Sequence, residues 1–300
     1  MTVTPQLVKE LRDRTQAGMM DCKKALEASD CDMEKAVTWL REKGMAKSLK
    51  KAGRTAAEGL CNYVVKGNTV LTYEVNCETD FAAQNQKFLD LVAKIGEILI
   101  DANFSNDEEA LAIESNGKAL SQIILEDSAV IGEKVSLRRV SKTVKEDSQT
   151  FGVYKHMGGR IVTVAVINNG DEVVAKDIAM HIAANNPQFV SREDIPADVV
   201  AKESQIILTE TLNENAKSEK PKPEAIIESK IVPGRVDKHF KEICLLDQPF
   251  VKNPEETVTV YLSHTKSTVA SFKRIEVGEG IEKQVADFAA EVAAQAGLAK

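Results

Sequence analysis

Cysteine, histidine and aromatic residues are scarce in this sequence of 300 residues. None of its five cysteines forms a Cys-x-x-Cys pair, and none of its four histidines has the His-x-x-x-His spacing of zinc enzymes. We therefore expect free thiols, as in a reducing cytosol, and no metal site. The cysteines are Cys22, Cys31, Cys61, Cys77 and Cys244, and the histidines are His156, His181, His239 and His264.

Sequence motifs of common enzyme classes are also missing. There is no Gly-x-x-x-x-Gly-Lys-Ser/Thr phosphate loop and no Gly-x-Ser-x-Gly nucleophile turn. The pair Gly158-Gly159 precedes a predicted strand rather than a helix, so it is not a dinucleotide-binding loop. His181 lies in an apolar helical pattern, which favours a structural histidine. The sequence thus favours a protein that is not an enzyme and needs no cofactor.

Long apolar runs are absent as well. No stretch approaches the roughly 18 uninterrupted apolar residues of a membrane span. Residues 1–5 show neither the basic-then-apolar pattern of a signal peptide nor an Arg- and Ser-rich leader. We expect a cytoplasmic protein without membrane contacts.

The charge is acidic overall but unevenly distributed. The net charge is −7, yet residues 1–54 carry 12 Lys+Arg against 8 Asp+Glu, and the remainder carries 27 against 38. An acidic body argues against direct binding to nucleic acid, which needs a broad basic face. With 43% hydrophobic and 28% charged residues, the chain is typical of a globular protein, and the basic N-terminal part suits a protein partner.

The N-terminal part predicts three short helices. Apolar residues recur at helical spacing in three runs, which Gly18 interrupts and Gly44 ends. Asp30 or Asp32 can cap the third run. The small, basic residues 47–54 then predict a linker.

The central part predicts an α+β fold. Residues 61–77 alternate apolar and polar around a Gly67-Asn68 turn, and in residues 71–77 the alternation predicts a strand with one solvated face. A helix with one apolar face follows. The same plan recurs after residue 150, with a turn at Gly158-Gly159, an almost wholly apolar strand over residues 161–167 and a closing strand over residues 269–277. We expect two subdomains, each with an antiparallel sheet covered by helices.

Two further helical segments accompany this core. A long helix after Pro196, the helix-breaking residues 217–223 and a returning apolar run predict a helical hairpin, either packed on itself or used for association, which could support a homodimer. The last residues predict an amphipathic helix that docks on its own core or on a partner. The predicted divisions are residues 1–54, 55–150, 151–190 with 236–277, 191–235 and 278–300.

One segment, residues 76–81, allows two interpretations. Thr79 or Asp80 can cap the helix that follows a strand. Phe81 falls in the first turn of that helix, seven positions before Phe88 and therefore on the apolar face, which favours a hydrophobic staple folded onto the core. Alternatively, Phe81 projects beside Asp80 from an exposed corner, as an anchor for a partner does. The pattern alone favours the staple.

Several longer motifs in order resemble the bacterial translation elongation factor Ts family. Nearly the whole chain takes part in the resemblance. The matching segments are residues 7–12 (Leu-Val-Lys-Glu-Leu-Arg), 18–26 (Gly-Met-Met-Asp-Cys-Lys-Lys-Ala-Leu), 74–81 (Glu-Val-Asn-Cys-Glu-Thr-Asp-Phe), 156–161 (His-Met-Gly-Gly-Arg-Ile), 178–183, 245–251 and 276–283.

The resemblance implies a guanine-nucleotide exchange factor that binds elongation factor Tu, a GTPase, in its GDP form. It also implies a ubiquitin-associated-like three-helix module, the two-subdomain core, the hairpin and a C-terminal helix. Asp80 and Phe81 would disturb the Mg²⁺ side of the nucleotide pocket, with Thr79 and Ala82 shaping the corner. This reverses the staple interpretation. The other partner-binding residues that the resemblance implies are Arg12, Met19, Met20, His156, Gly158 and Gly159.

Some features depart from the family pattern. Ala82 replaces a valine, residues 84–85 (Gln-Asn) replace a more basic pair, and the hairpin tip is extended. Residues 257–262 are strand-like by propensity where the family suggests a helix. A rival hypothesis is an adaptor that binds ubiquitin-like partners through residues 1–54, and binding of that module to other proteins would favour it.

Overall fold

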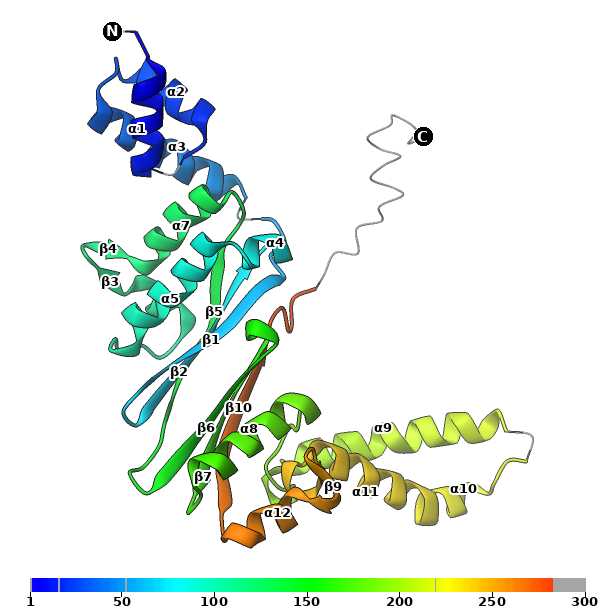
Figure 1. Ribbon diagram of the computed structural model, residues 1–300. Coiled ribbons are helices and arrows are strands. Elements are labelled where there is room, and N and C mark those ends of the chain that lie inside the picture. Colours follow the sequence, from blue (N-terminus) through cyan, green and yellow to red (C-terminus); the bar gives the residue numbers. More distant parts are fainter. Residues whose placement is uncertain (1, 16, 52, 219, 283–300) are drawn as a thin grey trace, which may run out of the picture. The chain divides into compact units, whose positions relative to one another are not determined.

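The computed structural model describes residues 2–15, 17–51, 53–218 and 220–282. The chain combines helices with two three-stranded sheets, which confirms the predicted α+β class (Figure 1). It divides into two compact units, each with its own sheet and core. Unit 1 comprises Met1–Thr143, Gly158–Arg160 and the described residues from Ile275 onward, and unit 2 comprises Val144–Met157 and Ile161–Arg274.

Three N-terminal helices open unit 1, as predicted: α1 (Pro5–Thr15), α2 (Met19–Ala28) and α3 (Met33–Lys50). Asp32 caps α3, because its carboxylate accepts the N–H groups of Glu34 (3.0 Å) and Lys35 (3.1 Å). Each helix contributes apolar side chains to one small core. Its buried members are Leu11, Cys22, Ala25, Leu26 and Ala36.

The predicted end of the third helix at Gly44 is wrong. Helix α3 continues to Lys50, so residues 47–50 are helical and not part of a linker. A Cβ atom at Gly44 would lie 3.0 Å from the Cβ of Ala129 in α7 (Leu120–Ile131), so the missing side chain lets the two helices approach closely. Tertiary packing therefore outweighs the low helix propensity of glycine.

The sheet of unit 1 has the strand order β1-β2-β5, with β1 (Glu58–Lys66), β2 (Thr69–Cys77) and β5 (Ser136–Val144). Strands β1 and β2 are antiparallel, and the pairing of Lys66 with Thr69 confirms the predicted Gly67-Asn68 turn. Helix α5 (Gln86–Ile100) packs on β1 and β2, and α7 packs on α5. Along the chain, α5 is followed by α6 (Asp107–Ala112) and the short strands β3 (Glu114–Ser115) and β4 (Lys118–Ala119), and then by α7.

The predicted solvated face of β2 is wrong. Thr72, Glu74 and Asn76 are buried and have polar partners: Thr72 bonds with Ser141 of β5, and Glu74 accepts from Asn76 and from the N–H of Gly278. The Oε2 atom of Glu74 lies 2.7 Å from Nε of Arg139 and 3.0 Å from Nε of Arg138. A buried carboxylate is tolerated only with such partners, so the polar alternation reflects an internal ion-pair cluster and not solvent.

Unit 2 repeats the hairpin-plus-helix plan. Its sheet has the order β10-β7-β6, with β6 (Gln149–His156), β7 (Ile161–Asn168) and β10 (Thr268–Glu276), and the predicted central strand is confirmed. Strands β6 and β7 are antiparallel. Helix α8 (Glu172–Asn185) packs closely on β6, since a Cβ atom at Gly152 would lie 1.8 Å from the carbonyl oxygen of Ala175.

Two single features of unit 2 answer questions that the sequence raised. His181 is fully buried, and both its ring nitrogens have partners, which confirms a structural histidine. Residues 258–262, which are strand-like by propensity, belong to helix α12 (Val258–Thr265). Thr257 ends β9 (Asn253–Thr257), a short strand that pairs with β8 (Pro249–Phe250). Val258 and Leu262 are both buried and four positions apart, so helical burial outweighs strand propensity.

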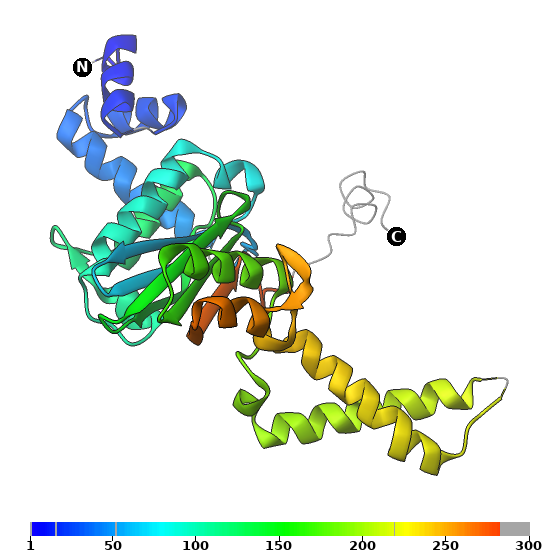
Figure 2. The ribbon, with the colours of Figure 1, turned by 60° about the horizontal axis from the view of Figure 1, so that its bottom comes forward.

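The predicted helical hairpin extends from unit 2. Helix α9 (Ala197–Ala216) runs out, and α10 (Glu224–Ile226), a π-helical turn (Ile227–Ile231) and α11 (Val232–Ile243) return beside it (Figure 2). Arg235 links the two sides through Glu214 (2.7 Å) and Thr211 (3.1 Å). The predicted C-terminal helix falls, beyond residue 282, outside the described residues.

Candidate protein-binding site

A sharp corner joins β2 to the helix α4 (Asp80–Ala83) in unit 1. The Thr79 hydroxyl caps α4, because its Oγ1 accepts the N–H of Ala82 at 3.2 Å. Phe81 follows with a side chain that is 82% exposed, and Asp80 beside it is also exposed. Such a large exposed apolar side chain is typical of an anchor for a binding partner.

The exposure of Phe81 depends on a break in the helix. Helix α4 ends at Ala83, and α5 starts anew at Gln86 with Asn85 as its cap. The angular argument that aligned Phe81 with Phe88 requires one continuous helix, so the staple interpretation fails. Phe88 is fully buried in the core, whereas Phe81 points to solvent. We name Thr79, Asp80, Phe81 and Ala82 the Phe81 corner.

The inner side of the Phe81 corner is packed into the core. Ala82 and Ala83 are buried in the same apolar cluster as Tyr73 and Phe88. Ala82 therefore supports the corner from its core side and offers little surface to a partner, and its role in partner binding stays a prediction. Burial also raises the pKa of the nearby Cys77 thiol to about 12, so this cysteine is not a reactive nucleophile at neutral pH.

Two acidic side chains tie the Phe81 corner to the turn after α7. The Oε2 atom of Glu133 accepts the N–H groups of Glu78 (2.9 Å) and Thr79 (3.0 Å), and its Oε1 accepts the Thr79 hydroxyl (2.6 Å). In return, Glu78 accepts the N–H of Lys134 at 2.7 Å. Glu78 also pairs with Arg54 at 3.1 Å. Two chain segments are thus bound to each other through both carboxylates. No sequence motif pointed to Glu133.

A second set of predicted residues lies on the N-terminal helices. Met19 and Met20 begin α2 and are 60% and 62% exposed, and Arg12 on α1 is exposed as well. Neither methionine is packed into the core of the three helices. Flexible, exposed methionines suit an adaptable protein contact.

The third set lies at the β6–β7 turn. His156 ends β6, and its Nδ1 lies 3.2 Å from the Tyr154 hydroxyl. Met157 adopts a positive φ of 47° and is 68% exposed, which the sequence analysis missed. Gly158 and Gly159 have φ angles of 67° and 117°, which glycine adopts at little cost. The exposure of Met157 could have been predicted from its position between His156 and two glycines, since side chains at the tip of a turn are exposed.

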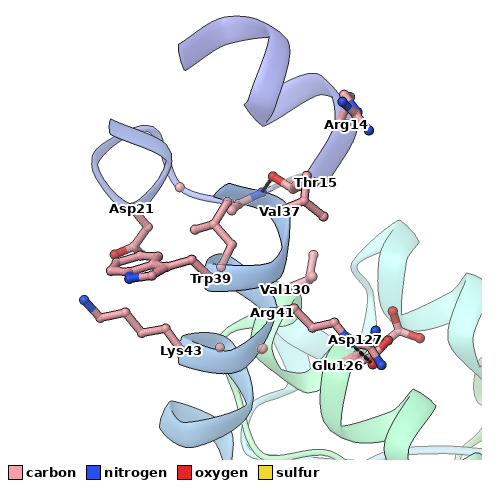
Figure 3. Close-up of a pocket in the computed structure, with 15 residues that line it drawn as sticks. Arg14, Thr15, Asp21, Val37, Trp39, Arg41, Lys43, Glu126, Asp127 and Val130 are labelled. Atoms are coloured by element: carbon pink, nitrogen blue, oxygen red, sulfur yellow. Dashed lines mark hydrogen bonds and ion pairs between the residues drawn. The ribbon is translucent and has the colours of Figure 1, made fainter. Parts of the chain in front are cut away.

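A cavity of about 330 Å³ lies elsewhere in unit 1, where α3 passes α7 (Figure 3). Trp39 lines it with Lys43, whose Nζ lies 4.1 Å from the ring centroid, and Arg41 pairs with Glu126 at 2.5 Å. Burial raises the pKa of the Asp127 carboxyl above its ordinary value. None of the ten predicted site residues lines this cavity. The candidate site is therefore a set of protruding surfaces and not a pocket.

Metal-binding clusters and membrane-spanning helices are both absent from the described residues. Among these residues, no three or more His, Cys, Asp or Glu side chains are grouped in a way that could hold a metal ion. Within the same ranges, no helix combines the length and the apolar character needed to cross a membrane.

Exposed aromatic and methionine side chains of this kind are typical of proteins that contact another protein. Residues 78–279 match the family described as Elongation factor TS. The chain is 51% identical to a protein named Elongation factor Ts from Acholeplasma laidlawii (strain PG-8A), over 98% of this chain and 99% of the relative. It is 47% identical, over the same shares, to a protein of that name from Spiroplasma citri. The chain belongs to the elongation factor Ts family and has a role in translation elongation.

Proposed function

We propose that this chain is a guanine-nucleotide exchange factor that binds elongation factor Tu in its GDP form and promotes GDP release. Membership of the elongation factor Ts family supports the choice of partner. The single observation that carries the proposal is the 82% exposure of Phe81 on a capped and packed corner. An apolar side chain of this size, held outside its own core, is available to enter another protein.

The proposed mechanism is a disturbance of the Mg²⁺ site of the GTPase. In such enzymes Mg²⁺ neutralises the phosphates of the nucleotide. Phe81 and Asp80 press in on the Mg²⁺ side, the ion leaves, and the phosphate charge becomes uncompensated. GDP then dissociates faster. In this scheme the nucleotide and the ion belong to the partner, so the chain itself carries no cofactor, transforms no substrate and acts in the cytoplasm as a binding protein and not as an enzyme.

The remaining two sets hold the partner in place, and their members are exposed or half-buried except Gly159, which is buried. Met19, Met20 and Arg12 contact the nucleotide-binding domain of elongation factor Tu. The β6–β7 turn contacts a separate β domain with His156, Gly158 and Gly159, and we add Met157 on account of its 68% exposure. Contacts on two domains allow the factor to remain bound while the nucleotide pocket is open.

A stopped-flow measurement tests the proposal. Elongation factor Tu is loaded with fluorescent GDP in the presence of Mg²⁺ and mixed with excess unlabelled GDP, with and without this chain. We expect GDP release to be faster by at least about tenfold with the chain, which corresponds to roughly 1.4 kcal/mol in the barrier. An unchanged release rate would show that the proposed function is wrong.

A further inference from the structure

The direction in which Phe81 points depends on a carboxylate from a distant part of the chain. Helix α4 has only four residues, and so short a helix is not stable by itself. Its cap, the Thr79 hydroxyl, has two partners, because it donates to Glu133 and accepts from the N–H of Ala82. Glu133 therefore determines the orientation of the group that starts α4.

Glu133 is itself held rigidly. Gly132 ends α7 in the left-handed conformation with a φ of 90°, which turns the chain sharply towards the Phe81 corner. The Ser128 hydroxyl on the last turn of α7 donates to the carbonyl oxygen of Glu133. The carboxylate then accepts three hydrogen bonds from Glu78 and Thr79 at 2.6 to 3.0 Å. Hydrogen bonds to an ionised acceptor are stronger than those between neutral groups.

We propose that Glu133 is a positioning residue for nucleotide exchange, and this inference rests on the proposed function. Its carboxylate holds the backbone of residues 78 and 79 so that α4 presents Phe81 in the binding-ready direction before the partner arrives. A corner that is already ordered loses less entropy on binding. Glu133 acts through Phe81.

Three variants separate positioning from general stability. Glu133→Ala removes all three hydrogen bonds, and Glu133→Gln keeps one carbonyl oxygen that can accept the two N–H groups. The matched control is Glu109→Ala. Glu109 accepts the N–H of Ser105 at 2.7 Å at the start of α6, so it is also a carboxylate that binds a backbone N–H beside a helix cap.

The first measurement is GDP release from elongation factor Tu at saturating variant. We expect Glu133→Ala to lower the acceleration by about tenfold, Glu133→Gln by less, and Glu109→Ala by less than about twofold. If Glu133→Ala matches the wild-type chain, or if Glu109→Ala is equally slow, the proposal is wrong.

A double-mutant cycle tests whether Glu133 works through Phe81. In a Phe81→Ala background there is no aromatic side chain to position, so Glu133→Ala should cause almost no further loss. If the two losses add, Glu133 acts by another route and the proposal is overturned.

Amide hydrogen exchange of the free chain gives a readout that does not depend on the partner. Protection of the Glu78 and Thr79 amides should fall in Glu133→Ala and persist in Glu109→Ala, and unchanged protection would contradict the role of Glu133. If the wild-type chain fails to accelerate GDP release while these amides behave as expected, the proposed function is wrong and the support of the corner by Glu133 stands.

Discussion

Phe81 lies in solvent although residues on both sides of it are anchored. Thr79 is bound to Glu133, and Ala82 is buried in the core of unit 1. An exposed aromatic ring contributes little to folding, because it has little apolar surface to remove from water. We propose that it serves the contact with elongation factor Tu.

We expect Phe81→Ala to leave the fold and most of the binding intact and to slow GDP release from elongation factor Tu. Loss of a binding anchor costs about 2 kcal/mol or more, which would correspond to roughly 30-fold in rate if it is used in the transition state. Stopped-flow GDP release and thermal unfolding measure the two effects. Val65→Ala, at an exposed apolar residue of β1, is the control and should change neither. Exchange at the wild-type rate would remove Phe81 from the mechanism.

His181 predicts a dependence of stability on pH. Its Nδ1 accepts the N–H of Val251 at 3.1 Å, so the ring proton is on Nε2, which lies 2.8 Å from Oε1 of Gln248. Burial lowers the pKa of His181 below its ordinary value of 6.5. At pH values between the lowered pKa of His181 in the folded chain and its ordinary pKa in the unfolded chain, His181 is protonated mainly in the unfolded chain. The contribution of His181 is therefore complete above pH 6.5 and is lost as the pH falls below that value.

Urea unfolding at a series of pH values measures this effect. We expect His181→Gln to be less stable than the wild type at about pH 7.5, since Val251 loses its acceptor, and to lose less stability on acidification. Parallel curves for the two proteins would show that His181 does not titrate in this way.

In each hairpin-plus-helix element a glycine lets the helix pack closely on the sheet. The glycine lies on the helix in unit 1 and on a strand in unit 2. In unit 1 the glycine is Gly96 of α5, and in unit 2 it is Gly152 of β6. A Cβ atom at Gly96 would lie 2.5 Å from the hydroxyl oxygen of Tyr73, whose ring is fully buried. The same hydroxyl donates to the carbonyl oxygen of Val92 at 2.7 Å, so it cannot move without losing this hydrogen bond.

We expect Gly96→Ala to destabilise the protein by about 1–3 kcal/mol, because the clash outweighs the higher helix propensity of alanine. Gly234→Ala is the matched control, since Gly234 lies in α11 and a Cβ atom added there would meet no neighbouring atom within 4 Å. At Gly234 only the higher helix propensity of alanine acts, so we expect the free energy of unfolding to rise by up to about 1 kcal/mol. Urea unfolding followed by circular dichroism compares the two. A stabilised Gly96→Ala would contradict the packing argument.

The sequence predicted the type of most helices and strands, and it failed where distant segments decide. Caps and two-residue turns act on their immediate neighbours. The Gly67-Asn68 turn was predicted correctly, and Asp32 was one of the two caps proposed for α3. The end of α3 depends on Ala129 in α7, and the burial of Glu74 depends on Arg138 and Arg139 in β5. Such contacts join residues that are far apart along the chain and leave no local pattern.

At the scale of the whole molecule, nucleotide exchange requires that GDP and the exchange factor each lower the affinity of the GTPase for the other. If the factor lowers the affinity for GDP by some ratio, GDP must lower the affinity for the factor by that ratio. Saturating GDP with Mg²⁺ should therefore weaken the complex with elongation factor Tu by about 5- to 150-fold, the usual range of such coupling. Isothermal titration calorimetry with and without GDP measures it, and removal of Mg²⁺ by a chelator should reduce the difference. An affinity that ignores GDP would be incompatible with the proposed mechanism.

The amino-acid sequence alone was enough to predict the α+β class, the repeated hairpin-plus-helix plan and the motifs of the elongation factor Ts family, because these depend on periodicity, turn residues and order along the chain. For Phe81 the two lines of sequence reasoning disagreed, since helical periodicity pointed inwards and the family resemblance implied an exposed side chain. The break after Ala83 and the carboxylate of Glu133 place the ring in solvent. Only the folded chain brings Glu133 to Thr79, and that contact between distant segments decides which surface the protein offers to a partner.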